Sequence, residues 1–191
     1  MKNNICRLTQ DDLPRLRDFW IEQWGNNFIV VHNEIIRYDE VDGFIHADWA
    51  GVITFMIRDE ECEITSLDSL QEGKGIGTAL INEVLREAKE KKCRRVFLIT
   101  TNDNLHALGF YQRRGFELVA IHRGAVNESR KIKPSIPMIG ENNIPLRDEI
   151  ELEYQIALSA VEAPHPSTTN FAHLPWRAVP GINAQFSAQG E

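Results

Sequence analysis

The chain has 191 residues and a formal net charge of −7, and 42% of its residues are hydrophobic. This composition is typical of a folded globular chain and excludes collagen-like, coiled-coil and wholly disordered proteins. The acidic charge argues against nonspecific binding to nucleic acid or to an anionic membrane, so we expect neither as a partner. An anionic ligand would therefore need a local binding device.

Targeting features and paired ligand motifs are missing from the sequence. No apolar stretch approaches the roughly 18 residues of a membrane span, and the N-terminus leads into no signal-peptide core. Three widely spaced cysteines, Cys6, Cys62 and Cys93, are typical of a reducing compartment, so we expect a cytoplasmic protein. The six histidines show no paired ligand spacing, and we expect no metal.

The first part of the chain predicts a strand, a helix and an antiparallel meander. Residues 5–8 read as a short strand. Apolar side chains then recur at helical spacing, at Leu13, Leu16, Trp20 and Trp24. Three short β-like runs follow, at residues 43–48, 51–58 and 63–70.

The middle of the chain predicts a βαβ unit. One face of a helix is apolar, with Ile76, Leu80, Val84 and Ala88. Residues 95–101 form a continuous apolar run, as expected of a strand covered on both faces. The strands on either side of this helix should therefore lie side by side and parallel.

The remaining chain predicts a helix, two strands and an irregular end. A helix over residues 104–114 is closed by Gly115, and a strand follows at residues 116–121. We expect residues 122–147 to form a long loop, and the alternation over 150–156 predicts a half-exposed strand. Residues 157–191 are proline-rich with few charges, and we expect an irregular extension beyond a domain of residues 1–156.

The strongest chemical signal is a glycine-rich segment between the third meander strand and the helix that follows. Gly73, Gly75 and Gly77 allow a sharp turn that brings backbone N–H groups close to a ligand. The start of the helix adds the positive end of its dipole, so the segment suits a phosphate or pyrophosphate. The same glycines could serve only as a turn. The segment matches neither a P-loop nor a complete dinucleotide fingerprint.

Two motifs in this order resemble the GNAT superfamily of N-acetyltransferases. Residues 73–77 (Gly-Lys-Gly-Ile-Gly) resemble its acyl-CoA pyrophosphate loop, and residues 104–116 resemble its next helix, which runs Asn, Ala, Phe-Tyr, then Gly-Phe. The resemblance covers roughly residues 5–156. It implies an α/β fold with a mixed, mostly antiparallel sheet, a central parallel strand pair that splays apart, and helices on both faces. It also implies acetyl-CoA as co-substrate.

The resemblance implies roles for matching residues. Tyr111 matches a general acid for the departing thiolate. An alkyl amine is protonated at neutral pH and needs a base, for which Glu63 is the main candidate and Glu61 and Asp68 are alternatives. Both Tyr111 and Glu63 could instead be structural. Cofactor contacts are expected at Leu67, Asp68, Ser69, Gly73, Lys74, Gly75, Ile76, Gly77, Thr78 and Asn104. Arg113 and Arg114 are further candidates for phosphate contacts.

These expectations describe an N-acetyltransferase that moves an acetyl group to a primary amine, of a small molecule or a peptide, by direct attack in a ternary complex. Residues 25–38 and 123–148 would border the amine pocket, and a homodimer is possible. One alternative is an inactive acyl-CoA-binding sensor or interaction module. It is motivated by Glu72, where the family usually has Gln or Arg, and by a loop about two residues shorter than usual. Another is a scaffold that no longer binds CoA.

Overall fold

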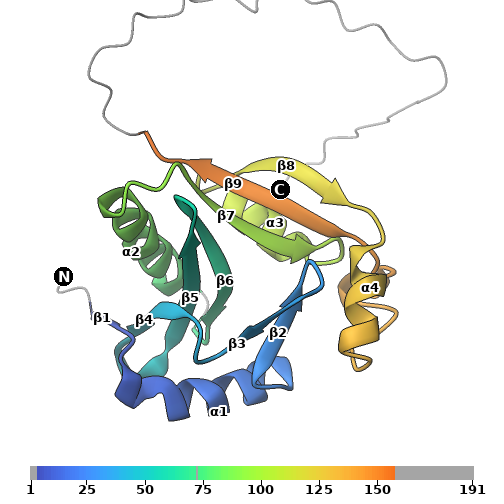
Figure 1. The fold of residues 1–191 in the computed structure, drawn as a ribbon, viewed down its shortest axis with the longest axis horizontal. Coiled ribbons are helices and arrows are strands. Elements are labelled where there is room, and N and C mark those ends of the chain that lie inside the picture. Colours follow the sequence, from blue (N-terminus) through green and yellow to red (C-terminus); the bar gives the residue numbers. More distant parts are fainter. Residues whose placement is uncertain (1–3, 72, 158–191) are drawn as a thin grey trace, which may run out of the picture. The chain divides into compact units, whose positions relative to one another are not determined.

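The computed structural model describes residues 4–71 and 73–157 (Figure 1). Within these residues a seven-stranded sheet has the order β1 (Ile5–Arg7), β4 (Asp42–His46), β5 (Gly51–Arg58), β6 (Glu61–Ser69), β7 (Arg95–Thr101), β9 (Glu149–Gln155) and β8 (Glu117–His122). A second sheet pairs β2 (Phe28–Val31) with β3 (Glu34–Arg37). The α-helices are α1 (Leu13–Trp24), α2 (Ile76–Glu90), α3 (Leu105–Gln112) and α4 (Ala125–Ile132).

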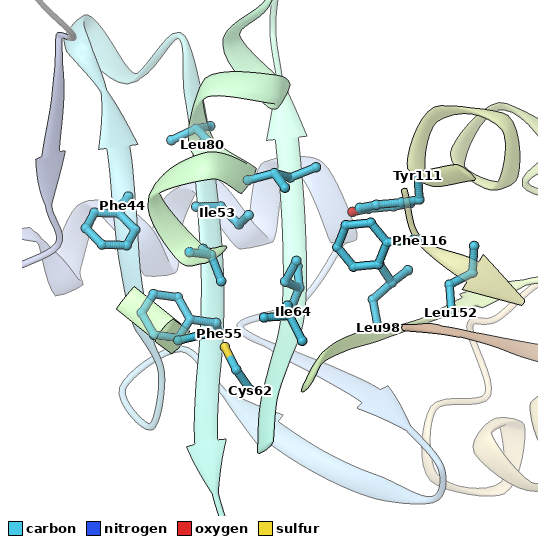
Figure 2. Packing of buried hydrophobic residues seen from close by; sticks show 14 of the residues in the cluster. Phe44, Ile53, Phe55, Cys62, Ile64, Leu80, Leu98, Tyr111, Phe116 and Leu152 are labelled. Carbon is cyan, nitrogen blue, oxygen red and sulfur yellow. The ribbon is translucent and has the colours of Figure 1, made fainter. Parts of the chain in front are cut away.

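Hydrophobic side chains form one core on each face of the main sheet. On one face, Leu80 and Val84 of α2 pack with Phe55 of β5 (Figure 2). On the other face, Leu16 and Trp20 of α1 pack with β5 side chains that point away from the side of Phe55. Successive side chains of a strand point to opposite faces, so β5 serves both cores. Helices therefore cover both faces, as predicted.

The parallel pair of strands lies in the middle of the sheet and separates partway along its length. β6 pairs with β7 in parallel from Glu61 opposite Arg95 to Ile64 opposite Leu98. Beyond this point β5 is the only partner of β6 among the described strands, while β7 continues beside β9. A bulge at Thr65 coincides with the separation, since the register of β5 against β6 shifts there. Bulges bend strands, and this one accompanies the divergence of β6 from β7.

Two elements differ from the sequence prediction. The β2–β3 hairpin was not predicted, because its two-residue turn is formed by His32 and Asn33, with φ of 49° and 63°, rather than by the usual Asn-Gly. The predicted loop over residues 122–147 is wrong in part, because it contains α4 and a short 3-10 helix, Glu141–Asn143. α4 has only eight residues and most of them are polar, so few apolar positions mark it in the sequence.

Strand boundaries also shift slightly. The turn before β6 is formed by Asp59 and Glu60, both with positive φ, so β6 begins at Glu61 rather than at residue 63. β4 ends at His46, and a 3-10 turn, Ala47–Trp49, replaces the end of the predicted strand. Apart from Ala157, the predicted extension lies outside the described residues. Within the described part of the chain, no helix has the length and apolar content needed to cross a membrane.

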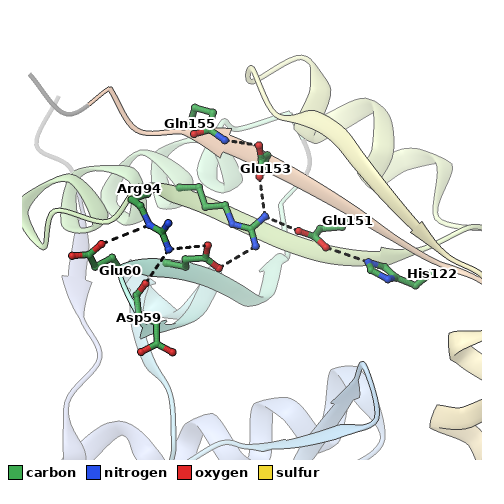
Figure 3. Close-up of polar contacts among 9 residues, drawn as sticks. Asp59, Glu60, Arg94, His122, Glu151, Glu153 and Gln155 are labelled. Atoms are coloured by element: carbon green, nitrogen blue, oxygen red, sulfur yellow. Dashed lines mark hydrogen bonds and ion pairs between the residues drawn. The ribbon is translucent and has the colours of Figure 1, made fainter. Parts of the chain in front are cut away.

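The base of the parallel pair is held by one arginine among three carboxylates. Arg95 of β7 forms ion pairs with Glu61 of β6 at 3.0 Å, and with Glu151 and Glu153 of β9 at 2.7 and 2.8 Å. The surrounding network includes His122 and Gln155 (Figure 3). Arg95 therefore joins three adjacent strands just before β6 and β7 separate.

Replacing Arg95 with methionine should lower the free energy of unfolding at pH 7 by about 1–3 kcal/mol, measured by urea denaturation. The substitution removes the cation that pairs with all three neighbouring carboxylates, and partial exposure keeps the loss below that of a fully buried pair. Arg86→Met is the control, because the ion pairs of Arg86 lie on the exposed side of α2. It should cost less than about 1 kcal/mol. Equal losses of stability in the two variants would contradict the conclusion that Arg95 holds the three strands together.

Candidate active site

A cleft of about 930 Å³ lies where β6 and β7 separate. Its walls come from the end of β6, the start of α2, and α3. It contains Tyr111 and every residue predicted to contact a cofactor except Lys74, which is exposed and lies outside the lining. The predicted base, Glu63, also lies outside this cleft. Glu72 is outside the described residues.

The glycine-rich segment forms the turn that starts α2. Gly73 and Gly75 have φ of 69° and 74°, in the left-handed region, and no atom lies within 4 Å of where a Cβ would be. These positions therefore need glycine for backbone conformation rather than for space. The first turn of a helix leaves amides without intrahelical acceptors, and the N–H of Ala79 is already bonded to the Gly75 carbonyl at 3.0 Å. The amides before Ala79 and the helix dipole favour an anion here.

Gly77 and Arg114 join the start of α2 to α3. A Cβ at Gly77 would lie 3.0 Å from the ring of Phe110, so glycine permits this close packing. The Arg114 guanidinium lies 3.4 Å from the centroid of the same ring and donates two hydrogen bonds to Thr78 Oγ1, at 3.0 and 2.6 Å. Arg114 is thus fixed at the anion site.

Arg114 brings a positive charge to the cleft. Within residues 4–71 and 73–157 it forms no ion pair with a carboxylate. Burial, together with the neighbouring charge of Arg113, lowers the pKa of Arg114. Arg114 lines the cleft whereas Arg113 does not, which separates the two candidates that the sequence left equal. A cation beside a helix N-terminus is a favourable setting for a phosphate.

Tyr111 is held in one orientation by aromatic packing. The side chain is 7% exposed and lies between Phe110 and Phe116, with ring centroids 5.2 and 5.4 Å away. Its hydroxyl points from α3 toward the strand that carries Ile64 (Figure 2). Burial raises the pKa of Tyr111, and the charge of Asp68 adds to the effect. The phenol therefore stays protonated at neutral pH and can donate a proton.

Two further polar side chains of the cleft have structural partners. Asn104 precedes α3, and its side-chain oxygen accepts a hydrogen bond from the Ala107 amide at 2.9 Å, which caps the helix. Its amide nitrogen is the group left for a ligand. Asp68 accepts a hydrogen bond from Trp24 Nε1 at 3.2 Å, and burial raises its pKa to about 6. Trp24 belongs to α1, so the cleft reaches the α1 side of the sheet.

Glu63 lies in a second cavity of about 270 Å³, bordered by the β2–β3 hairpin. Burial raises the pKa of Glu63 to about 7, and the nearby charge of Glu34 adds to the shift, while Arg58 opposes it. A carboxyl group with this pKa can accept a proton near neutral pH. Sequence analysis pointed to residues 25–38 as a border of the amine pocket but to no individual hairpin residue. His32 and Glu34 both line this cavity.

The two cavities meet the parallel strands at consecutive residues. Glu63 and Phe97 line the smaller cavity, while the next residues, Ile64 and Leu98, line the cleft. Consecutive strand residues face opposite sides of a sheet. Glu63 and Tyr111 therefore approach the separation of β6 and β7 from opposite faces, and they do not share one cavity.

Comparison with known proteins identifies the family. A model of the Acetyltransferase (GNAT) family matches residues 6–116. The uncharacterized Bacillus subtilis protein YdhI is 46% identical over 139 residues, which cover 71% of this chain and 87% of YdhI. The uncharacterized YxbD of the same organism is 44% identical over 153 residues, or 78% of this chain and 96% of YxbD. The chain therefore belongs to the GNAT acetyltransferase family.

A solved structure has the same fold. It is a Bacillus subtilis acetyltransferase in complex with CoA, with a TM-score of 0.56 and 22% sequence identity. The match covers 80% of this chain and 97% of that structure. The predicted architecture is thereby confirmed.

The raised pKa of Glu63 predicts a pH-dependent stability difference. Its pKa rises from an ordinary 4.5 to about 7 on folding, so the folded state favours the neutral form of Glu63 over the charged form. The wild type should lose this part of its stability as the pH rises from about 4.5 through about 7. Glu63→Gln carries no charge, so its melting temperature should match the wild type near pH 4.5 and exceed it at pH 8.

Scanning calorimetry across this pH range measures the difference. Glu117→Gln is the matched control, because Glu117 is exposed on β8. Its melting temperature should follow the wild type at every pH. A difference for Glu63→Gln that is constant with pH would show that folding leaves the pKa of Glu63 unchanged.

Proposed function

We propose that the protein transfers an acetyl group from acetyl-CoA to a primary amine of a small molecule or peptide, by direct attack in a ternary complex. The observation that carries this proposal is the cleft between β6 and β7. It contains a positively charged site suited to an anion at the start of α2, and it reaches the opening between the two parallel strands. Family membership supports acetyl transfer, and the CoA complex of a protein with this fold supports CoA as the ligand.

The pyrophosphate of CoA would lie at the amides of Gly75, Ile76, Gly77 and Thr78, with Arg114 beside it. The pantetheine arm would follow β6 at Leu67, Asp68 and Ser69. These residues pair with β5 on one side, but their register with β7 has already ended at Ile64. Their β7-facing edge is therefore free to bond the amides of an extended ligand.

The ammonium form of the substrate loses two protons from its nitrogen in the reaction, and the departing thiolate gains one. In the proposed step Glu63 accepts a proton from the ammonium form of the substrate, directly or through water, and the freed amine attacks the thioester carbonyl. Backbone amides of β6 beyond Ile64 polarise that carbonyl. The C–N bond forms and the C–S bond breaks, and Tyr111 donates a proton to the departing thiolate. The nitrogen then releases its second proton, which passes through water and restores the phenol of Tyr111. The amine would enter through the cavity that contains Glu63.

The direct test incubates the purified full chain with acetyl-CoA and a panel of primary amines and peptides. We expect release of CoA that depends on the amine, with the acetylated amine detected by mass spectrometry. Calorimetric titration with CoA is run in parallel. Binding of CoA without turnover on any amine would overturn the enzymatic proposal and favour the inactive acyl-CoA-binding module.

Arg114→Met should raise the dissociation constant for CoA by roughly 10-fold to 100-fold, because it removes a charge-assisted contact to the pyrophosphate. Isothermal titration calorimetry measures the change. Arg113→Met is the matched control, since Arg113 is the adjacent arginine but lies outside the cleft lining. It should change the dissociation constant by less than a factor of about three. Equal effects in the two variants would show that Arg114 does not contact the bound CoA.

Tyr111→Phe should lower kcat by roughly 10²-fold to 10⁴-fold, because it removes the general acid, while the KM for acetyl-CoA changes little. Tyr154→Phe is the control, because Tyr154 packs on Phe116 outside the cleft.

In the wild type, kcat/KM should rise with pH through about 7 as Glu63 loses its proton. Glu63→Gln should lose this rise. An unchanged kcat in both Tyr111→Phe and Glu63→Gln would contradict the proposed roles of Tyr111 and Glu63.

A further inference from the structure

Two histidines that lie far apart in the sequence meet at the edge of the second cavity. His32 forms the turn of the β2–β3 hairpin, His122 ends β8, and Glu151 lies in β9. One donor atom from each residue lies within 4.8 Å of the other two. These histidines show no paired spacing in the sequence, because the fold and not a local motif brings them together.

The orientation of His32 is fixed by a buried carboxylate. Glu149 is 3% exposed, and its Oε2 lies 2.9 Å from His32 Nδ1 and 3.3 Å from the His32 backbone nitrogen. Ser129 Oγ donates to the other oxygen at 3.3 Å. With a proton on Nδ1, His32 Nε2 has a free lone pair. A carboxylate behind a histidine in this way is the usual arrangement that orients a metal ligand.

The other two residues have the spacing that a metal ion requires. His122 Nε2 and Glu151 Oε2 lie 3.1 Å apart and point toward each other (Figure 3). Two ligands about 2.0–2.2 Å from a tetrahedral zinc ion are separated by roughly 3.4 Å, so a shift of a few tenths of an ångström would admit the ion. Arg95 binds the second oxygen of Glu151 at 2.7 Å and holds this carboxylate in place.

The cluster is open on one side. The side chains of His32 and His122 are 36% and 33% exposed, and their rings meet edge to face with centroids 4.1 Å apart. Partial exposure gives an ion a path to the site and leaves a coordination position for water or another ligand. Two imidazoles and a carboxylate suit zinc and similar divalent transition metals better than magnesium, which prefers oxygen ligands.

We propose that His32, His122 and Glu151 bind a divalent transition-metal ion, with Glu149 as the positioning residue for His32. The ion would connect the β2–β3 hairpin, which forms a sheet of its own, to β8 and β9 of the main sheet. Because His32 also lines the cavity of Glu63, the ion would fix one wall of that cavity. The proposal does not depend on acetyl transfer.

The test uses the full chain, treated with EDTA and dialysed, and titrated with zinc by isothermal titration calorimetry. We expect one strong equivalent and a zinc-dependent rise in melting temperature. Cobalt should give the visible bands of a tetrahedral site without the ultraviolet thiolate band that a cysteine ligand produces. Magnesium should neither bind detectably nor shift the melting temperature.

His32→Asn and His122→Gln should each weaken zinc binding at least tenfold. Asparagine tolerates the positive φ of the hairpin turn, and unchanged melting temperatures in EDTA show that both variants fold. Glu149→Gln should weaken binding by roughly 10-fold to 100-fold, as expected of a positioning residue. Cys6→Ser and His106→Ala control for zinc held at an exposed thiol or at another histidine, and they should bind zinc like the wild type. If the double variant His32→Asn/His122→Gln binds zinc as tightly as the wild type, or if the wild type binds none, the residues form only two histidine–glutamate ion pairs.

Discussion

The candidate site depends on the end of pairing between β6 and β7. Up to Ile64 and Leu98 the two strands satisfy each other's backbone groups, and Arg95 holds their base to β9. Beyond that point β5 is the only described strand that pairs with β6, so within the described residues one edge of its backbone is free. Unpaired backbone groups inside a protein are costly unless something bonds them, and here the cleft gives a ligand access to them. The anion site at the start of α2 lies in the same cleft.

The separation also divides the chemistry between two faces of the sheet. Tyr111 approaches from the α3 side, where aromatic packing and burial keep its phenol protonated. Glu63 lies on the hairpin side, where burial and the charges of other carboxylates raise its pKa to about 7. The proposed acid and base are thus kept apart. Tyr111 keeps its proton at neutral pH, and Glu63 can accept one there. In the proposed reaction Glu63 takes a proton from the amine nitrogen and Tyr111 gives one to the thiolate sulfur, from opposite faces of the sheet.

Much of this arrangement follows from local sequence patterns. The helical period from Ile76 to Ala88 and the apolar run over residues 95–101 predicted the parallel pair. The glycines predicted the turn that starts α2, and the anion site there stays a prediction. Strand alternation alone would also have placed Glu63 and Ile64 on opposite faces. The hairpin escaped prediction because its turn uses His32 and Asn33 at positive φ without glycine. The meeting of His32 with His122 depends on tertiary packing, which no local pattern encodes.

The proposed function requires that the free edge of β6 binds the acyl-pantetheine arm. Hydrogen–deuterium exchange of the backbone amides, with acetyl-CoA and separately with 3′,5′-ADP, tests it most directly. We predict that acetyl-CoA slows exchange both at residues 73–78 and at residues 65–69 of β6. The nucleotide, which lacks the arm, should leave residues 65–69 unchanged. Protection of residues 73–78 by acetyl-CoA with no change in β6 would contradict the account, because the arm would then lie elsewhere.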